Sequence, residues 1–118
     1  MSIEMRSEGV VLAELPAEPE AFEELENVIC CVQDRGGYDV VLDFTNVEFL
    51  TSRSLAPLLR LKQQLGYDGQ RILLCCVGDT IRGVLSVTAL DEIFEVVDNR
   101  HDALTALQVM PVLATNIQ

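Results

Sequence analysis

Short runs of apolar residues alternate along the chain with longer segments in which apolar residues recur every three or four positions. The runs lie at residues 10–12, 40–42, 72–75 and 93–97. The runs at 40–42 and 72–75 are unbroken, which is typical of strands that are covered on both faces, whereas 93–97 is a short last strand that contains Glu95. The segments between them have helical spacing and predict amphipathic helices. Strands that alternate with helices need crossover connections, which produce a mainly parallel sheet with helices packed on it.

Residues 3–5 alternate weakly and are followed by a turn at residues 7–9, so the chain is predicted to open with a two-stranded hairpin. The hairpin would add an antiparallel edge to the sheet. We therefore expect a single α/β domain with four to five strands in a mixed sheet and about four helices. The helices are predicted within residues 16–37, 51–66, 79–90 and 98–110.

Residues that favour helix ends occur near the boundaries of these segments. Gly36-Gly37 is predicted to stop the first helix, and Gly66 the second. Asp79 is predicted to cap the third helix, and Asp98 or Asn99 the last. The buried stripe of the second helix is predicted to consist of Leu55, Leu58, Leu59 and Leu65.

Length and charge narrow the class of protein. We expect one domain over residues 1–110 and a tail over residues 111–118 of the 118-residue chain. No apolar run approaches the ~18–20 residues of a membrane-spanning helix, and the N-terminus lacks the pattern of a signal peptide, so a cytoplasmic protein is expected. With 19 acidic and 8 basic residues the net charge is −11. This charge argues against nucleic acid or an anionic membrane as partner. It favours a protein partner with a basic face, or serves solubility alone.

Catalytic and metal-binding residues are sparse. The four cysteines form two adjacent pairs, Cys30–Cys31 and Cys75–Cys76, without the two-residue gap of zinc and redox motifs. We interpret them as small, mostly buried thiols of a reducing compartment. His101 is the only histidine and is predicted to face solvent. With no Ser/His/acid set and no phosphate-binding glycine loop, the sequence predicts no enzyme, no cofactor and no metal site.

Three hydroxyl side chains and one arginine gather in the segment "FLTSRSLAPLL", where a strand-like run gives way to a helix. They are Thr51, Ser52, Arg53 and Ser54. Thr51 or Ser52 would cap the helix, an effect worth ~1 kcal/mol, but a cap needs only one hydroxyl. A phosphoryl group here would be held by the free amides of the helix N-terminus, with Arg53 as a charged contact. It would add roughly −1.5 to −2 charges and would switch an interface.

Two aspartates lie near this corner. Asp43 belongs to the strand-like run that leads to it, and Asp79 follows the next strand along the chain. In a parallel sheet the loops after the carboxyl ends of the strands form the functional edge. Asp43 is therefore predicted to form a turn or to bind a partner, and the same prediction holds for Asp79.

The segment "VVLDFTNVEFLTSRSLAPLL" resembles the phosphorylation segment of the STAS domain, the fold of bacterial anti-sigma factor antagonists. In that family a strand leads through an Asp-Ser-Ser-Gly motif into a helix, and the first serine is phosphorylated. Ser52 falls on that serine. The order of elements is also similar over about residues 3–108. The chain departs from the motif with Thr51 in place of Asp, Arg53 in place of Ser and Ser54 in place of Gly.

The resemblance implies an anti-sigma factor antagonist that binds a serine kinase of the anti-sigma type, or another signalling protein. Phosphorylation of Ser52 would end binding. The resemblance makes Thr51 and Ser54 reserve acceptors or caps, and Arg53 a phosphate or partner contact. The remaining partner-binding candidates are Asp43, Asp79, Glu14 and Glu18, the last two because either would replace a carboxylate that the family carries at the end of its second strand.

Two other functions remain open. A STAS-like module that does not use phosphorylation would serve as an assembly scaffold, through its acidic first helix or an exposed strand edge. A third class is the sensing of a small ligand, a nucleotide or a lipid, at the strand ends. Only Arg53 and Arg82 supply positive charge for such a ligand.

Overall fold

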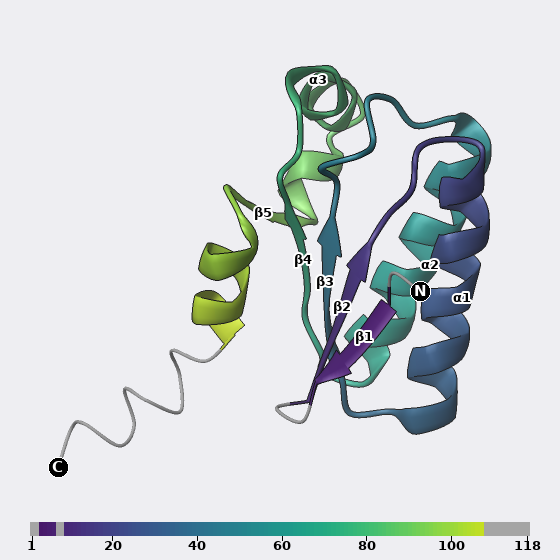
Figure 1. Ribbon diagram of the computed structural model, residues 1–118, viewed down its shortest axis with the longest axis vertical. Helices are drawn as coiled ribbons and strands as arrows, with labels where there is room; N and C mark the ends of the chain where they lie inside the picture. The colour runs from purple at the N-terminus through teal and green to yellow at the C-terminus, as the bar shows by residue number, and fades with distance from the viewer. Residues whose placement is uncertain (1–2, 7–8, 108–118) are drawn as a thin grey trace, which may run out of the picture.

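Five strands form one mixed sheet in which neighbours in sequence are also neighbours in space (Figure 1). The computed structural model describes residues 3–6 and 9–107. β1 pairs antiparallel with β2, whereas β2 to β5 are parallel, as the sequence predicted. The strands are β1 (Ile3–Arg6), β2 (Val10–Glu14), β3 (Asp39–Asp43), β4 (Ile72–Cys75) and β5 (Glu95–Val97).

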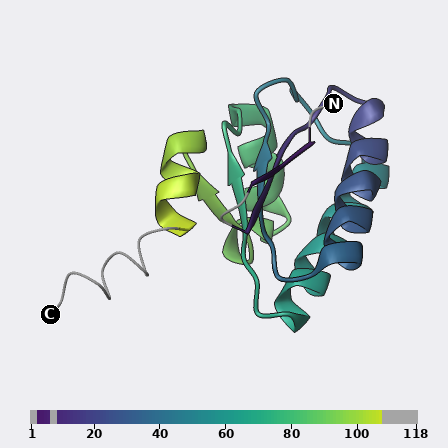
Figure 2. The same cartoon turned by 60° about the horizontal axis from the view of Figure 1, so that its bottom comes forward.

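Helices cover both faces of this sheet. α1 and α2 lie side by side on one face, and a helix over residues 100–107, here called the terminal helix, lies on the other (Figure 2). The predicted α/β architecture is therefore confirmed. The labelled helices are α1 (Glu20–Arg35), α2 (Ser52–Tyr67), α3 (Asp79–Val87) and the short 3-10 helix η1 (Leu90–Glu92).

The central strand β3 shows how the two faces are filled. Val40 and Leu42 belong to the large core beneath α1, α2 and α3, whereas Val41 belongs to a smaller cluster beneath the terminal helix. All three are fully buried. Alternate side chains of a strand point to opposite faces, so an unbroken apolar run is what a strand covered on both faces requires. Burying each of these side chains stabilises the fold by about 1.5–3 kcal/mol.

The helix ends follow the sequence in part. α1 stops at Gly36, whose φ of 67° is left-handed and whose amide donates to the Val32 carbonyl, as predicted. The prediction that Gly66 stops α2 is wrong, because the helix runs on through Tyr67. The glycine with a left-handed backbone after α2 is Gly69, whose φ is 74°. A glycine inside a helix costs only about 1 kcal/mol, which packing of the helix easily offsets.

Two assignments within helices also change. Leu59 is 40% exposed, and Leu61 takes the inward position in its place. The cap of α3 is Gly78, and Asp79 is instead the first residue of the helix and makes no side-chain capping bond.

The cap of the terminal helix is Asn99, one of the two residues predicted for this role. Its side chain accepts a hydrogen bond from the Asp102 amide at 2.8 Å.

The strand-like run before the hydroxyls divides into two parts. β3 ends at Asp43, and residues 44–51 form a loop instead of continuing the strand. Phe44 and Val47 are buried and fix this loop to the core, and the Val47 amide closes a turn on the Phe44 carbonyl at 3.0 Å. The predicted tail, residues 111–118, lies outside the described residues. No helix among residues 3–6 and 9–107 is long and apolar enough to cross a membrane.

Candidate functional site at the strand–helix corner

The carboxyl ends of three parallel strands meet at the edge of the sheet where α2 and α3 begin (Figure 1). In the strand register Glu14 of β2 lies beside Asp43 of β3, which lies beside Cys75 of β4. We call residues 51–54, where α2 begins, the strand–helix corner. The edge therefore gathers polar residues from segments far apart in the sequence.

Thr51 is the N-cap of α2. Its backbone is extended, with φ of −83° and ψ of 160°, and its hydroxyl accepts a hydrogen bond from the Ser54 amide at 3.3 Å. The same hydroxyl lies 3.3 Å from a carboxylate oxygen of Glu18, to which it donates. Both hydrogen-bonding roles of the Thr51 hydroxyl are therefore already used within the fold.

The two serines of the corner have opposite environments. Ser54 is fully buried, and its hydroxyl has no hydrogen-bond partner among the described residues. Ser52 is exposed at the first position of α2, and within the described part of the chain nothing bonds to its side chain. Of the three hydroxyls, that of Ser52 alone is both open to solvent and uncommitted.

Glu18 brings a carboxylate to the start of α2. One of its oxygens accepts a hydrogen bond from the Thr51 amide at 2.9 Å. Its other oxygen is buried without a partner among the described residues. A negative group is favoured at a helix N-terminus, where the backbone dipole and free amides are directed. The loop before α1 therefore stabilises the start of α2.

Arg53 contacts the first turn of α1. Its guanidinium lies 4.1 Å from the centre of the Phe22 ring, a cation–π contact. The two side chains line a pocket of about 170 Å³ together with Pro19, Glu20 and Glu23. Arg53 thus ties the corner to the first turn of α1, in surroundings that are acidic.

Asp43 is buried, with 3% of its surface exposed. One oxygen accepts from the Thr45 amide at 2.8 Å and from the Thr45 hydroxyl at 2.6 Å. The other accepts from Nε of Arg100. Burial raises the pKa of this carboxyl, but the bonds from Thr45 and Arg100 outweigh it and hold the pKa below its usual value. Asp43 forms the predicted turn, and its three hydrogen bonds all come from Thr45 and Arg100; we call Asp43, Thr45 and Arg100 the Asp43 cluster.

Arg100 also joins β2 to the terminal helix. One of its nitrogens lies 3.5 Å from Glu14, whose carboxylate accepts from the Asn46 amide group at 3.1 Å. Arg100, which is 57 residues from Asp43, is not among the site residues predicted from the sequence. A signal existed, since an aspartate in a strand covered on both faces needs a cationic partner. The sequence does not show which of the basic residues supplies it.

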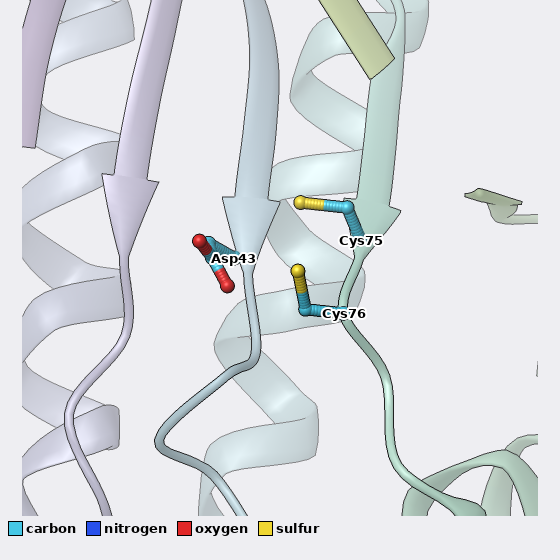
Figure 3. Close-up of side chains that lie close together, drawn as sticks. All are labelled: Asp43, Cys75 and Cys76. Atoms are coloured by element: carbon cyan, nitrogen blue, oxygen red, sulfur yellow. The ribbon is translucent and has the colours of Figure 1, made fainter. Parts of the chain in front are cut away.

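The cysteine pairs differ from the prediction of mostly buried thiols. Cys30 is exposed, Cys31 and Cys76 are half-buried, and Cys75 alone is buried; all four are free. Burial raises the pKa of the Cys75 thiol to about 12, with the Asp43 charge as a further cause. Figure 3 shows the sulfur atoms of Cys75 and Cys76 turned toward β3, where Asp43 lies.

The region around Asp79 is open. Asp79 is exposed at the first position of α3 and lines a pocket of about 310 Å³ with Thr45, Glu48 and Cys76. The pocket is lined by two acids and no basic side chain. Its walls therefore suit a cation or a neutral group better than a phosphate. His101 is exposed, as predicted.

Comparison with known proteins shows the family. The sequence profile described as the STAS domain matches residues 20–103. The chain belongs to the STAS domain family. A curated relative, the anti-sigma F factor antagonist of Paenibacillus polymyxa, is 28% identical over 79 residues, which cover 67% of this chain and 68% of the relative.

Solved structures share the fold of this STAS domain. An anti-sigma-factor antagonist (STAS) domain protein from Planctomyces limnophilus has a TM-score of 0.77 at 23% identity, over 88% of this chain and 94% of that one. SpoIIAA of Bacillus in its phosphorylated form has a TM-score of 0.68 at 18% identity, over 89% and 96% of the two chains. At these identities the likeness establishes the fold alone. The predicted family is confirmed, and the role of Ser52 stays a prediction.

Proposed function

We propose that this STAS domain is an anti-sigma factor antagonist that binds a serine kinase of the anti-sigma type, and that phosphorylation of Ser52 ends the binding. The observation that carries the proposal is the state of the three hydroxyls at the corner. Thr51 is engaged as a cap and Ser54 is buried, whereas Ser52 is exposed without a partner in the described chain. A kinase can reach Ser52 without unfolding α2.

In the proposed step the Ser52 oxygen attacks the terminal phosphorus of ATP held by the kinase. The P–O bond to ADP breaks, and the hydroxyl proton passes to a base of the kinase. The product carries roughly −1.5 to −2 charges at the start of α2. Glu18 already holds a negative charge there through the Thr51 amide. The phosphate therefore competes with Glu18 for the helix N-terminus and repels an acidic partner rim.

The surface around Ser52 supports partner binding. Phe49 is 54% exposed in the loop before the corner, and an exposed aromatic side chain is a common anchor of interfaces. Glu14, Glu18 and Asp79 would supply charged contacts around it, and Arg53 would add a cation beside α1. Asp43 is buried, so we assign it to holding this edge in place.

Two substitutions test the proposal against a serine-kinase anti-sigma factor of the same organism, with affinity measured by titration calorimetry. We expect Ser52→Ala to bind like the unmodified protein. Ser52→Asp should bind at least about 10-fold more weakly, because it places a charge where the partner docks. Thr105→Asp adds the same charge to an exposed site on the terminal helix and should leave affinity unchanged. Equal affinities for Ser52→Asp and Ser52→Ala would contradict the switch.

A second function, a scaffold that does not use phosphorylation, has one observation in its favour. Glu18 already accepts a hydrogen bond from the Thr51 amide, so a carboxylate lies at the start of α2 before any phosphate arrives. This function predicts that partner binding is the same before and after treatment with ATP and the host's kinases. A loss of binding after the same treatment would reject it.

A further inference from the structure

Three potential metal ligands come together beside the strand–helix corner. The ligand atoms of Asp43, Cys75 and Cys76 all lie within 4.8 Å of one another, the only such group found among residues 3–6 and 9–107. Asp43 and Cys75 are paired across β3 and β4 and lie on the face of the sheet that the terminal helix covers. Cys76 adds its sulfur from just beyond the end of β4 (Figure 3).

The backbone at Cys76 explains how two adjacent cysteines reach one place. Successive side chains of a strand point to opposite faces, which would separate the two sulfurs. Cys76 instead has a φ of 58°, in the left-handed region that is costly for a residue with a side chain. Cys75 and Cys76 therefore both point toward Asp43, and the structure maintains an unfavourable backbone conformation to place them so.

The donors have the chemistry of a thiophilic metal site. Thiolate sulfur with one carboxylate oxygen suits Zn²⁺ and related ions, with Zn–S distances of about 2.3 Å and Zn–O distances of about 2.0–2.2 Å. Asp43 receives three hydrogen bonds, two from Thr45 and one from Arg100. A carboxylate has about four lone-pair positions, so one remains for a metal. Arg100 and Thr45 would then orient the ligand, as the outer groups of metal sites do.

We propose that Asp43, Cys75 and Cys76 form a binding site for one thiophilic divalent cation of the zinc class. Binding displaces the protons of the two thiols, so each metal ion releases two protons and leaves two thiolates and one carboxylate on the ion. Of the three ligands, Cys76 also lines the pocket of about 310 Å³ beside Asp79, and we propose that a fourth ligand reaches the ion from that side. This site is independent of the proposed phosphorylation of Ser52.

The sequence pattern predicted no metal site because adjacent cysteines lack the usual spacing. The third ligand comes from a different strand, and the second sulfur is placed by a left-handed residue. Neither feature can be read from spacing along the chain. The proposal therefore rests on the placement of the three side chains in space.

Cadmium is a suitable probe, because thiolate–cadmium bonds give an ultraviolet charge-transfer band. Fully reduced protein is titrated with Cd²⁺ under anaerobic conditions, and Zn²⁺ affinity is measured by competition with a chromophoric chelator. We expect the band to saturate at one cadmium per chain. Cys75→Ser and Cys76→Ser should each weaken metal binding by at least about 10-fold. Loss of a group that only orients a ligand already weakens metal affinity by about 10-fold or more, and loss of a ligand should cost at least as much.

The other cysteine pair provides a matched control. Cys30 and Cys31 are also adjacent but lie on α1, where Cys30 is exposed. The double variant Cys30→Ser/Cys31→Ser should keep the full cadmium band. Three results would overturn the proposal: no band from reduced protein, unchanged affinity in Cys76→Ser, or loss of the band in the Cys30/Cys31 variant.

Discussion

The strand–helix corner and the Asp43 cluster lie at the same edge of the sheet, but their polar groups differ in exposure and in hydrogen bonding. At the corner, Ser52 is exposed and has no partner within the described chain. In the cluster, Asp43 is buried and receives three hydrogen bonds, one of them from Arg100 on the terminal helix. One region leaves a group free to react, and the other uses its groups to fix the fold.

The energetic difference explains this division. A buried carboxylate without partners is strongly destabilising, so Asp43 has to keep its hydrogen bonds. An exposed hydroxyl is easily changed, because surface substitutions usually alter stability by less than about 0.5 kcal/mol. A site that is to be modified without unfolding the protein therefore belongs at a place like Ser52. The comparison predicts large stability effects in the cluster and small ones at the corner.

The largest effect is expected from Arg100→Ala. The substitution removes the only basic side chain bonded to Asp43 in the described chain. Hydrogen bonds to charged groups contribute about 1.5–3 kcal/mol, so the free energy of unfolding should fall by about that amount in urea. Arg60→Ala is the control, because its pair with Glu26 is exposed and worth about 1 kcal/mol or less. Equal losses in both variants would contradict the assignment of a stabilising role to the pair of Asp43 and Arg100.

The second prediction concerns pH. The pKa of Asp43 is lower in the folded protein than its usual value of 3.8. Its ionised form therefore stabilises the fold above pH 3.8, and this contribution is lost as the pH falls below 3.8 through the lower folded pKa. Urea unfolding of the unmodified protein and of Asp43→Asn across this range would measure it. The variant should lack the part of the acid-induced loss that Asp43 contributes; identical slopes would contradict the assignment.

A third, smaller effect separates two neighbouring residues of the corner. Thr51→Ala removes the cap of α2 and should cost about 1 kcal/mol. Ser52→Ala removes a hydroxyl that bonds to nothing in the described chain and should change stability by less than about 0.5 kcal/mol. Thermal unfolding of both variants measures the difference. If Ser52→Ala proved the more destabilising, the assignment of cap and free hydroxyl would be reversed.

A stability effect no larger than that of Thr51→Ala is expected for Glu18→Gln. The substitution removes the charge at the N-terminus of α2 but keeps an oxygen that can accept from the Thr51 amide. A charge at this position is worth about 0.3–1 kcal/mol. The loss should shrink when salt is added, since such interactions are screened. A loss that does not depend on salt would place the role of Glu18 in packing instead of charge.

Much of the fold could be predicted from the sequence because local patterns encode it. The unbroken runs at Val40–Leu42 and in β4 indicated strands covered on both faces, and the left-handed Gly36 stopped α1 as expected. The two-residue period of a strand and the apolar face of a helix are patterns among neighbouring residues of the chain. Such features can be predicted from the local sequence, without knowledge of contacts between distant residues.

The rest depends on contacts between distant residues. The strand-like run to Leu50 ends at Asp43, because Asp43 turns the chain by accepting bonds from Thr45. Its pairing with Arg100 spans 57 residues, and no local pattern selects that arginine. Ser52 was marked by a family resemblance, whereas its freedom could be judged only once Thr51 and Ser54 had been placed.

The most direct test is to determine the phosphorylation state of the protein in its own cells. Protein is isolated with and without phosphatase inhibitors, its intact mass is measured, and the modified residue is mapped by fragmentation. We predict a single phosphate on Ser52, preserved by the inhibitors and absent from Ser52→Ala. If no phosphate appears under any growth condition, nor after incubation with ATP and the host's kinases, the switch is contradicted.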